Sequence, residues 1–260
     1  MISAPDIRIA HEGQDWAGHA ADLVLSIGQE AVRANGRFLL ALSGGSTPKL
    51  LYDQLAAPAY VNRFDWAPTI FLFSDERAVP PDHQDSNFGL ADKALFAPLH
   101  IAPTRIHRMK AEEHDIGLAA HAYEETIRSL TKTAQPVWPQ LDLILLGLGD
   151  DGHTASLFPG TAVLNDRTHL VVPNQSPKGI PSRLTMTLGV INRATVVLFL
   201  VTGAGKASMV RALLEPCTEA ERTLPAALVK PTNGRLIWLI DRPAASALST
   251  GAGSVNDPGR

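Results

Sequence analysis

The sequence predicts an α/β fold, a single-domain, three-layer, Rossmann-like sandwich with a mostly parallel sheet. Short, predominantly apolar segments at 38–42, 69–73 and 195–201 have the composition of strands buried on both faces of a sheet. They alternate with segments whose apolar residues recur at helical spacing. This alternation of buried strands and helices is typical of parallel sheets covered by helices on both sides.

The first half of the chain begins with a helical pattern over 14–35, which Gly36 ends. Thr47 and Pro48 are expected to be the N-cap and the first residue of a helix that runs to about residue 55. The remaining elements expected in this half are two buried strands at 38–42 and 69–73 and a helix near 87–96.

The second half contains the most continuous β-forming run of the chain, 195–201. The other elements expected here are a helix over 112–130, a strand that starts at Leu141, a strand over 169–172, a helix over 206–214 and a last strand over 236–240. We expect one domain over residues 1–243. The tail, 244–260, is rich in Ala, Ser and Gly and is expected to form a short helix and to be partly disordered beyond it.

Composition limits the class of protein. Apolar residues make up 45% and charged residues 19% of the 260 positions, as in ordinary soluble globular proteins. The net charge of −3 offers no general attraction to nucleic acid or anionic membranes. No secretory signal or membrane-length apolar run is visible, and the single Cys217 allows neither a disulfide framework nor a cysteine metal cluster. We therefore expect a cytoplasmic protein, monomeric or homodimeric, without a nucleic-acid or membrane partner.

A glycine-rich loop at 147–153 follows the strand that begins at Leu141. Loops at strand ends are where α/β folds bind ligands, and His153 at the end of this loop can exchange a proton near neutral pH. The loop also matches the dinucleotide-binding pattern G-x-G-x-x-G. However, Asp150 and Asp151 lie inside it and would repel a pyrophosphate. The sequence therefore favours a catalytic edge over a dinucleotide site.

A second loop, 43–48, joins a strand to a helix and consists of small and hydroxyl-bearing residues. Its glycines, hydroxyls and helix N-terminus direct several donors to one spot, which suits a phosphate group. A plain turn capped by Thr47 is the alternative, but six small or polar residues are more than a turn needs. The predicted phosphate-binding residues of this loop are Ser43, Gly44, Gly45, Ser46 and Thr47.

Charged residues follow two further strands. Asp75 and Arg77 come two and four residues after the strand 69–73, where a carboxylate near an arginine could also be a simple surface ion pair. Lys206 follows 195–201 through a glycine-rich loop and could reach an anion as a point charge. Arg183 is the weakest of these predictions, because most arginines are solvated surface residues without a role in a site. The histidines show no metal-ligand spacing, so no metal site is predicted.

Four segments together resemble the 6-phosphogluconolactonase family: 43–48, 74–77, 147–160, and Arg183 with 203–206. Their order and spacing match, and the resemblance extends over nearly the whole chain. It implies an α/β fold shared with glucosamine-6-phosphate deaminases and ribose-5-phosphate isomerases, no cofactor, and hydrolysis of 6-phospho-D-glucono-1,5-lactone in the oxidative pentose phosphate pathway. It further implies that His153 is the general base and that Asp75 is a partner in catalysis. The implied phosphate ligands are the loop 43–48, Arg183 and Lys206, with Arg77 near the site.

The residues suit such a reaction. Hydrolysis of a lactone needs a positioned water, a base that works near neutral pH and donors for the developing oxyanion. We hypothesise that His153 takes a proton from the attacking water and that Asp151 or Asp75 orients its imidazole. Backbone N–H groups of the glycine loop, at Gly149 and Gly152, could hold the oxyanion.

Two other functions remain open at this point. Glucosamine-6-phosphate deaminases have a similar Asp-Gly-His loop, but they typically continue to Phe-Asn-Glu-Pro, whereas Leu-Phe-Pro-Gly stands at 157–160 here. They also have Asp-Glu-Tyr where this chain has Asp-Glu-Arg at 75–77. A sugar-phosphate sensor without catalysis would keep the phosphate loop and could lose the base, which His153 argues against.

Overall fold

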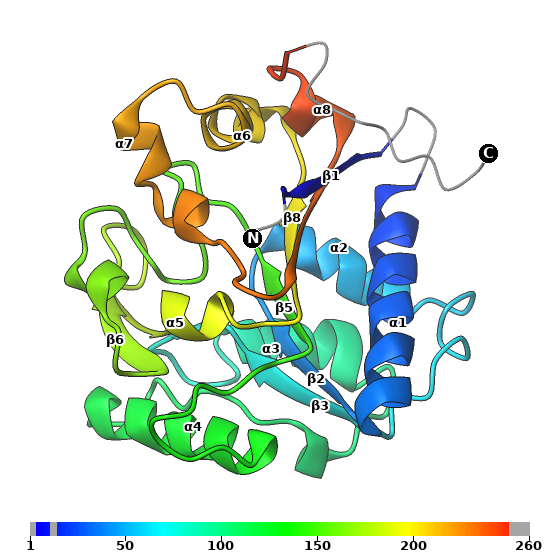
Figure 1. Cartoon of the computed structure of the whole chain (residues 1–260). Coiled ribbons are helices and arrows are strands. Elements are labelled where there is room, and N and C mark those ends of the chain that lie inside the picture. Colours follow the sequence, from blue (N-terminus) through cyan, green and yellow to red (C-terminus); the bar gives the residue numbers. More distant parts are fainter. Residues whose placement is uncertain (1–3, 11–14, 250–260) are drawn as a thin grey trace.

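The computed structural model describes residues 4–10 and 15–249 and has a central sheet of six parallel strands (Figure 1). A buried strand needs apolar residues on both faces, and β2, β3, β5 and β8 are buried at every position. The strands in spatial order are β1 (Asp6–Ile9), β9 (Arg235–Ile240), β8 (Val196–Val201), β5 (Leu143–Leu146), β2 (Phe38–Leu42) and β3 (Thr69–Phe73).

Helices cover both faces of this sheet. In Figure 1, α1 (Trp16–Asn35) and α2 (Ser46–Leu55) lie to the right of the central strands, and α5 (Leu188–Ile191) and α7 (Glu219–Arg222) lie to the left. The other helical elements are α3 (Asn87–Ala91), the π-helix η1 (Asp92–Phe96), α4 (Ile116–Thr131), α6 (Ala207–Leu214), α8 (Arg242–Ala245) and the short 3₁₀ turns η2 (Pro103–Arg105), η3 (Ala162–Asn165), η4 (Ala204–Lys206) and η5 (Pro225–Leu228).

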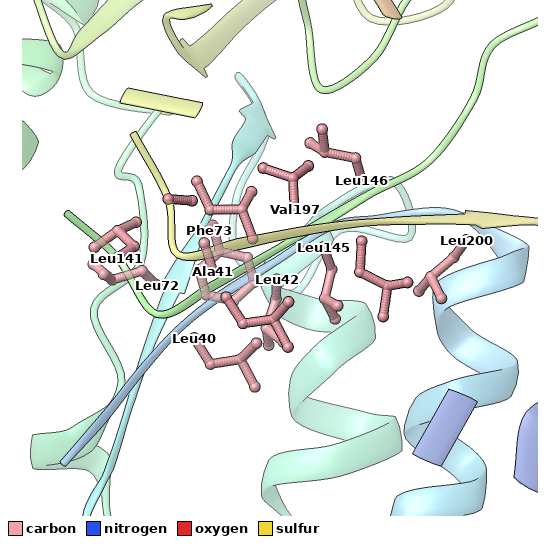
Figure 2. Close-up of a cluster of buried hydrophobic side chains, with 14 of the residues drawn as sticks. Leu40, Ala41, Leu42, Leu72, Phe73, Leu141, Leu145, Leu146, Val197 and Leu200 are labelled. Atoms are coloured by element: carbon pink, nitrogen blue, oxygen red, sulfur yellow. The ribbon is translucent and has the colours of Figure 1, made fainter. Parts of the chain in front are cut away.

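Apolar side chains of β2, β3, β5 and β8, most of them leucines, pack together in the core, as Figure 2 shows. Leu40, Leu145 and Val197 come from three adjacent strands and have no exposed surface. Burying such side chains is the main favourable contribution to folding. The rigid centre of the sheet therefore fixes the positions of the loops that leave its strands.

A second, antiparallel sheet was not predicted. It consists of β4 (Asp75–Arg77), β7 (Ser182–Met186) and β6 (Val171–Gln175). The strand expected over 169–172 belongs to this small sheet, where α4 packs against it. The three-residue β4 is too short to give a periodic signal. Three of the five residues of β7 are polar, namely Ser182, Arg183 and Thr185, and they do not alternate regularly with apolar ones.

The predicted helices and strands are largely confirmed, with one corrected cap. The helix over 14–35 is α1, which ends at Gly36 in the left-handed conformation, with φ +69°; its expected first residue, Gln14, lies outside the described residues. Thr47 is not the N-cap of α2, because the helix starts at Ser46, two residues earlier than predicted, and Gly45 is the N-cap. The Thr47 hydroxyl instead lies 2.8 Å from the Thr202 hydroxyl, which links the first turn of α2 to the residue that follows β8.

The proposed boundary at residue 243 falls inside α8. Ala244 is buried, and Ser249 bonds to the Glu215 carboxylate through both its backbone N–H and its hydroxyl. The remainder of the predicted tail, 250–260, lies outside the described residues. None of the helices in the described ranges combines the length and apolar character needed to cross a bilayer.

Asp166 stabilises the turn that leads into β6. Its carboxylate accepts hydrogen bonds from the backbone N–H groups of Thr168 and His169 at 2.8 and 2.9 Å, and it contacts the His169 ring at 2.8 Å. Burial opposes ionisation of this carboxyl, but the hydrogen bonds from His169 and Thr168 outweigh it and lower the pKa of Asp166 from 3.8 to about 2.

We expect Asp166→Asn to lower the free energy of unfolding at pH 7 by about 1 kcal/mol. Because the folded-state pKa is depressed, the stabilisation is present above the unfolded value of 3.8 and disappears as the pH falls through about 2. Urea denaturation of both proteins at pH 7, 5, 4 and 3 measures the difference. A difference that stays constant down to pH 3 would contradict this role of the carboxylate.

Candidate active site

Four loops leave the carboxyl ends of neighbouring strands and meet at one edge of the central sheet. The loop 43–45 follows β2, 147–153 follows β5, Thr202 and Gly203 follow β8, and Ser74 leads from β3 into β4. The chain passes from β2 to β3 on one side and later to β5 on the other, so the order of the strands reverses at β2. In open α/β sheets, ligands bind in the crevice at such a reversal.

A cavity of about 270 Å³ lies at this edge. It is close to the small end of the usual size range of ligand pockets, about 300–1,000 Å³. Arg183, Asp151 and Gly152 are predicted site residues that do not line it. The predicted residues that do line it are Ser43, Gly44, Gly45, Ser46, Thr47, Asp75, Arg77, Gly149, His153 and Lys206.

His153 is paired with Asp151. The ring Nδ1 lies 2.5 Å from Asp151 Oδ1, and the His153 backbone N–H donates to the same oxygen at 3.1 Å. Burial opposes ionisation of Asp151, but the hydrogen bonds from His153 outweigh it and hold the pKa of Asp151 below its ordinary value. A carboxylate only accepts, so Nδ1 carries the proton and Nε2 of the neutral ring is left as an acceptor. That is the tautomer a general base requires.

The glycine loop holds this ring in place. Gly149 packs so closely on the imidazole that a Cβ at this position would lie 2.0 Å from His153 Nδ1. The Gly149 N–H donates to the His153 carbonyl at 2.9 Å, and the Gly152 N–H donates to the Gly149 carbonyl at 3.1 Å. Both N–H groups are thus engaged inside the loop, and neither is free to hold an oxyanion as the sequence had led us to expect. The contacts of the loop instead hold the imidazole of His153 in place.

Asp75 belongs to a different set of contacts. Its carboxylate accepts hydrogen bonds from the Ser156 hydroxyl at 2.6 Å and from the Asn87 side-chain amide at 3.1 Å. The carboxylate that contacts the His153 ring is therefore that of Asp151, which settles the alternative left open by the sequence. Asp75 still lines the cavity, and a carboxylate has about four acceptor positions, so it retains capacity to accept from a ligand.

The loop after β2 has the shape expected of an anion-binding turn. Gly45 has φ +104°, a value that favours glycine, and is the N-cap of α2 without a side-chain cap. The first N–H groups of a helix lack partners within the helix and carry partial positive charge. The sequence did not predict the role of Tyr52. Its hydroxyl donates to the Ser43 carbonyl at 2.6 Å and accepts from the Ser43 N–H at 3.1 Å.

We expect Tyr52→Phe to raise the KM for a phosphorylated substrate several-fold and to lower the free energy of unfolding by about 1–3 kcal/mol, because the substitution leaves the buried backbone groups of Ser43 without their partner. The fully buried hydroxyl is the only group removed. Steady-state kinetics and urea denaturation measure the two effects. An unchanged KM together with a destabilised fold would show that Tyr52 supports the core but not the loop.

Three cations were predicted near a phosphate. Arg77 lines the cavity; its Nη1 donates to the Asp85 carbonyl at 2.7 Å, and its buried Nε has no hydrogen-bond partner in the described part of the chain. Lys206 also lines the cavity and forms an ion pair with Asp150. Asp150, which argued against a pyrophosphate, therefore neutralises a lysine at the rim.

Arg183 is placed differently from the expectation of a solvated side chain. It lies opposite Arg77 in the pairing of β4 with β7 and is only 8% exposed. Its Nε donates to the Ile180 carbonyl at 2.7 Å, so the guanidinium is directed to its own loop. Burial lowers the pKa of Arg183, and the neighbouring Arg77 charge adds to this effect.

Two other features of the described residues bear on the site. No group of three or more His, Cys, Asp or Glu side chains among them is arranged to hold a metal ion. A larger hollow of about 710 Å³ lies beside α3 and η1, but its lining includes none of the predicted site residues. The cavity at the sheet edge is therefore the candidate active site.

The fold and the site together define an α/β enzyme class with a histidine–aspartate pair beside an anion-binding loop. Residues 11–238 match the family model described as glucosamine-6-phosphate isomerases/6-phosphogluconolactonase, and the chain belongs to this family. The 6-phosphogluconolactonase of Rattus norvegicus is 39% identical over 94% of this chain and 93% of its own length. That of Nostoc sp. is 37% identical over 88% and 92%. The solved 6-phosphogluconolactonase structure from Trypanosoma brucei superimposes with a TM-score of 0.81 at 27% identity, over 95% of this chain and 99% of the other.

Proposed function

We propose that this protein hydrolyses 6-phospho-D-glucono-1,5-lactone to 6-phospho-D-gluconate, the second step of the oxidative pentose phosphate pathway, in the cytoplasm. The observation that carries the proposal is the pairing of His153 with Asp151 in the same cavity as the loop 43–47. A base and an anion-binding loop are the two features that a phosphorylated lactone requires at opposite ends. The 6-phosphogluconolactonase names of the relatives support the same activity.

His153 acts as the general base. Its Nε2 takes a proton from a water molecule as the water oxygen attacks the lactone carbonyl carbon, and the carbonyl oxygen takes up the negative charge. When the tetrahedral intermediate collapses, the bond from this carbon to the ring oxygen breaks and the imidazolium gives its proton to that oxygen. Asp151 stays ionised throughout and stabilises the imidazolium through Nδ1. No covalent intermediate with the enzyme is needed.

The phosphate of the substrate binds to the N-terminus of α2 and to the side chains of Arg77 and Lys206. The first turn of α2 supplies unpaired N–H groups, and the two cations line the same cavity. Binding the remote phosphate fixes the lactone relative to His153, so that part of the binding energy serves the reaction. Asp75 remains in the cavity as an acceptor for a sugar hydroxyl or the attacking water.

The alternative within the family is glucosamine-6-phosphate deamination. The segment after His153 argues against it, because Phe158 packs on the imidazole with ring centroids 4.8 Å apart. A phenyl ring, and no additional carboxylate from this segment, thus lies against the base. Of the three neighbouring residues His153, Phe158 and Asp151, His153 is therefore the one we propose to take the proton from water.

The experiment that tests the proposal is a time-resolved assay of freshly made 6-phosphogluconolactone, because the lactone also hydrolyses spontaneously. We expect the protein to accelerate the disappearance of the lactone in proportion to enzyme concentration. Glucosamine-6-phosphate, tested in parallel, is expected to release no ammonia. Release of substantial ammonia and fructose-6-phosphate from glucosamine-6-phosphate would show that the protein is a deaminase. Saturable binding of the lactone without turnover would favour a sugar-phosphate sensor.

A further inference from the structure

Buried hydrogen bonds, continued by one packing contact, connect the segment after His153 to the loop proposed to bind phosphate. The three side chains involved are Ser156, Asp75 and Asn87, which are 1%, 5% and 1% exposed. The Ser156 hydroxyl donates to one Asp75 carboxylate oxygen at 2.6 Å, and the Asn87 amide donates to the other at 3.1 Å. A buried carboxylate with a donor on each oxygen is held in one orientation.

Ser156 lies three residues after His153 and is fixed from several sides. Its backbone N–H donates to the Thr185 hydroxyl at 3.2 Å, and its carbonyl accepts from the Asn174 amide at 2.8 Å. Thr185 lies directly opposite Asp75 in the pairing of β4 with β7. The backbone of Ser156 is therefore held by the small sheet, and its hydroxyl is the group that connects the His153 loop to Asp75.

Asn87 forms the other end of this connection. Its amide nitrogen also donates to the backbone carbonyl of Asp75 at 2.9 Å. Asn87 therefore binds both the backbone and the side chain of Asp75. Its Oδ1 is packed against Gly44, where a Cβ would lie only 1.8 Å away. The position of the phosphate loop is thus limited by Asn87, and Asn87 is fixed by Asp75.

We propose that Ser156 is a positioning residue for catalysis, which sets the His153 loop in register with the phosphate loop by holding the Asp75 carboxylate. This inference rests on the proposed lactonase function. A substrate anchored at its phosphate presents its carbonyl to the base only if the two loops keep a fixed separation. Misplacement of reacting groups by about 1 Å can cost about 10²-fold in rate.

The first test is Ser156→Ala, which removes the hydroxyl alone. We expect kcat on 6-phosphogluconolactone to fall about 10–100-fold, because misalignment affects the chemical step, while KM changes little. The matched control is Ser74→Ala. Ser74 is the residue before Asp75 and is also buried, and its hydroxyl donates to the Leu42 carbonyl at 3.0 Å. The control substitution therefore removes a similar hydrogen bond but none to the Asp75 carboxylate. We expect Ser74→Ala to keep the wild-type kcat.

A double-mutant cycle with Asp75→Asn separates positioning from a structural effect. If Ser156 acts through Asp75, Ser156→Ala costs its full 10–100-fold in the wild-type background and little in the Asp75→Asn background. Thermal unfolding of all four proteins checks that the fold is kept. If the role of Ser156 were purely structural, Ser156→Ala would lower the melting temperature, and its effect on kcat would not depend on the residue at position 75.

The outcomes are distinct for the two proposals. A wild-type protein that turns over the lactone, with Ser156→Ala at the wild-type kcat, overturns the role of Ser156 and leaves the lactonase function intact. Losses that multiply in the double variant, or an equal loss in Ser74→Ala, also overturn it. A wild-type protein without turnover above the spontaneous rate overturns the proposed function and this inference together.

Discussion

The variant His153→Ala is expected to lose about 10³-fold in kcat on 6-phosphogluconolactone, within the range that general bases contribute. The methyl side chain cannot accept the proton of the attacking water, and Asp151, which contacts His153 at Nδ1, is left without the imidazole between it and the substrate. The residues proposed to bind the phosphate are on other loops, so KM should remain within a few-fold of the wild-type value. Initial rates over a range of lactone concentrations, corrected for spontaneous hydrolysis, measure both constants.

A companion variant, Gly149→Ala, tests the same geometry without removing the base. Gly149 is not among the glycines of positive φ, so its backbone accepts alanine, but the new Cβ would lie 2.0 Å from His153 Nδ1. The ring must move away from Asp151, and kcat should fall in the same direction as for His153→Ala. Near-full activity in both variants, with unchanged melting temperatures, would exclude His153 as the base.

Replacing Lys206 by methionine is the second change expected to have a large effect. Charge-assisted hydrogen bonds contribute about 1.5–3 kcal/mol, so loss of the ammonium should raise KM for the phosphorylated lactone about 10–100-fold. The unphosphorylated glucono-1,5-lactone provides the control on the substrate side, because its rate should not respond to the substitution.

Asp150→Asn provides the control on the protein side. Asp150 pairs with Lys206 and is largely exposed, with 76% of its side chain accessible. Removing its charge frees the ammonium for the substrate phosphate, so KM should stay the same or fall. If Lys206→Met affected both lactones equally, Lys206 would not be a phosphate ligand. A higher KM in Asp150→Asn would mean that the ion pair positions the lysine.

The central sheet could be predicted because its strands are buried on both faces. The ranges 38–42 and 69–73 coincide with β2 and β3 residue for residue, and 195–201 exceeds β8 by one residue. The small sheet could not be predicted in the same way. Its strand β4 has only three residues, all of them charged, and they are in a strand because they pair with β7. Tertiary pairing of this kind leaves no local signal.

The candidate site residues were identified from their positions at strand ends. The sequence offered Asp151 or Asp75 as the partner of His153, and it did not predict the partners of Asp75. The pair Asp151 and His153 is local, since the carboxylate accepts from a backbone N–H two residues on, and this turn is typical of aspartate. The Ser156 and Asn87 contacts of Asp75 span 81 and 12 positions of the sequence. Such contacts depend on how β4 meets the loops after β2 and β5. Residue type and spacing therefore indicated the position of the candidate site, and the packed structure was needed to show which groups each carboxylate contacts.

The measurement that tests the central claim most directly is chemical rescue of His153→Ala by imidazole. The claim is that a neutral imidazole at this position takes the proton from water. His153 is 34% exposed at its side chain, so a free imidazole can enter the space that the substitution leaves. We predict a variant rate close to spontaneous hydrolysis that rises with the concentration of neutral imidazole, above the increase that imidazole causes without enzyme. A His153→Ala variant that hydrolyses the lactone at the wild-type rate without imidazole would contradict the claim.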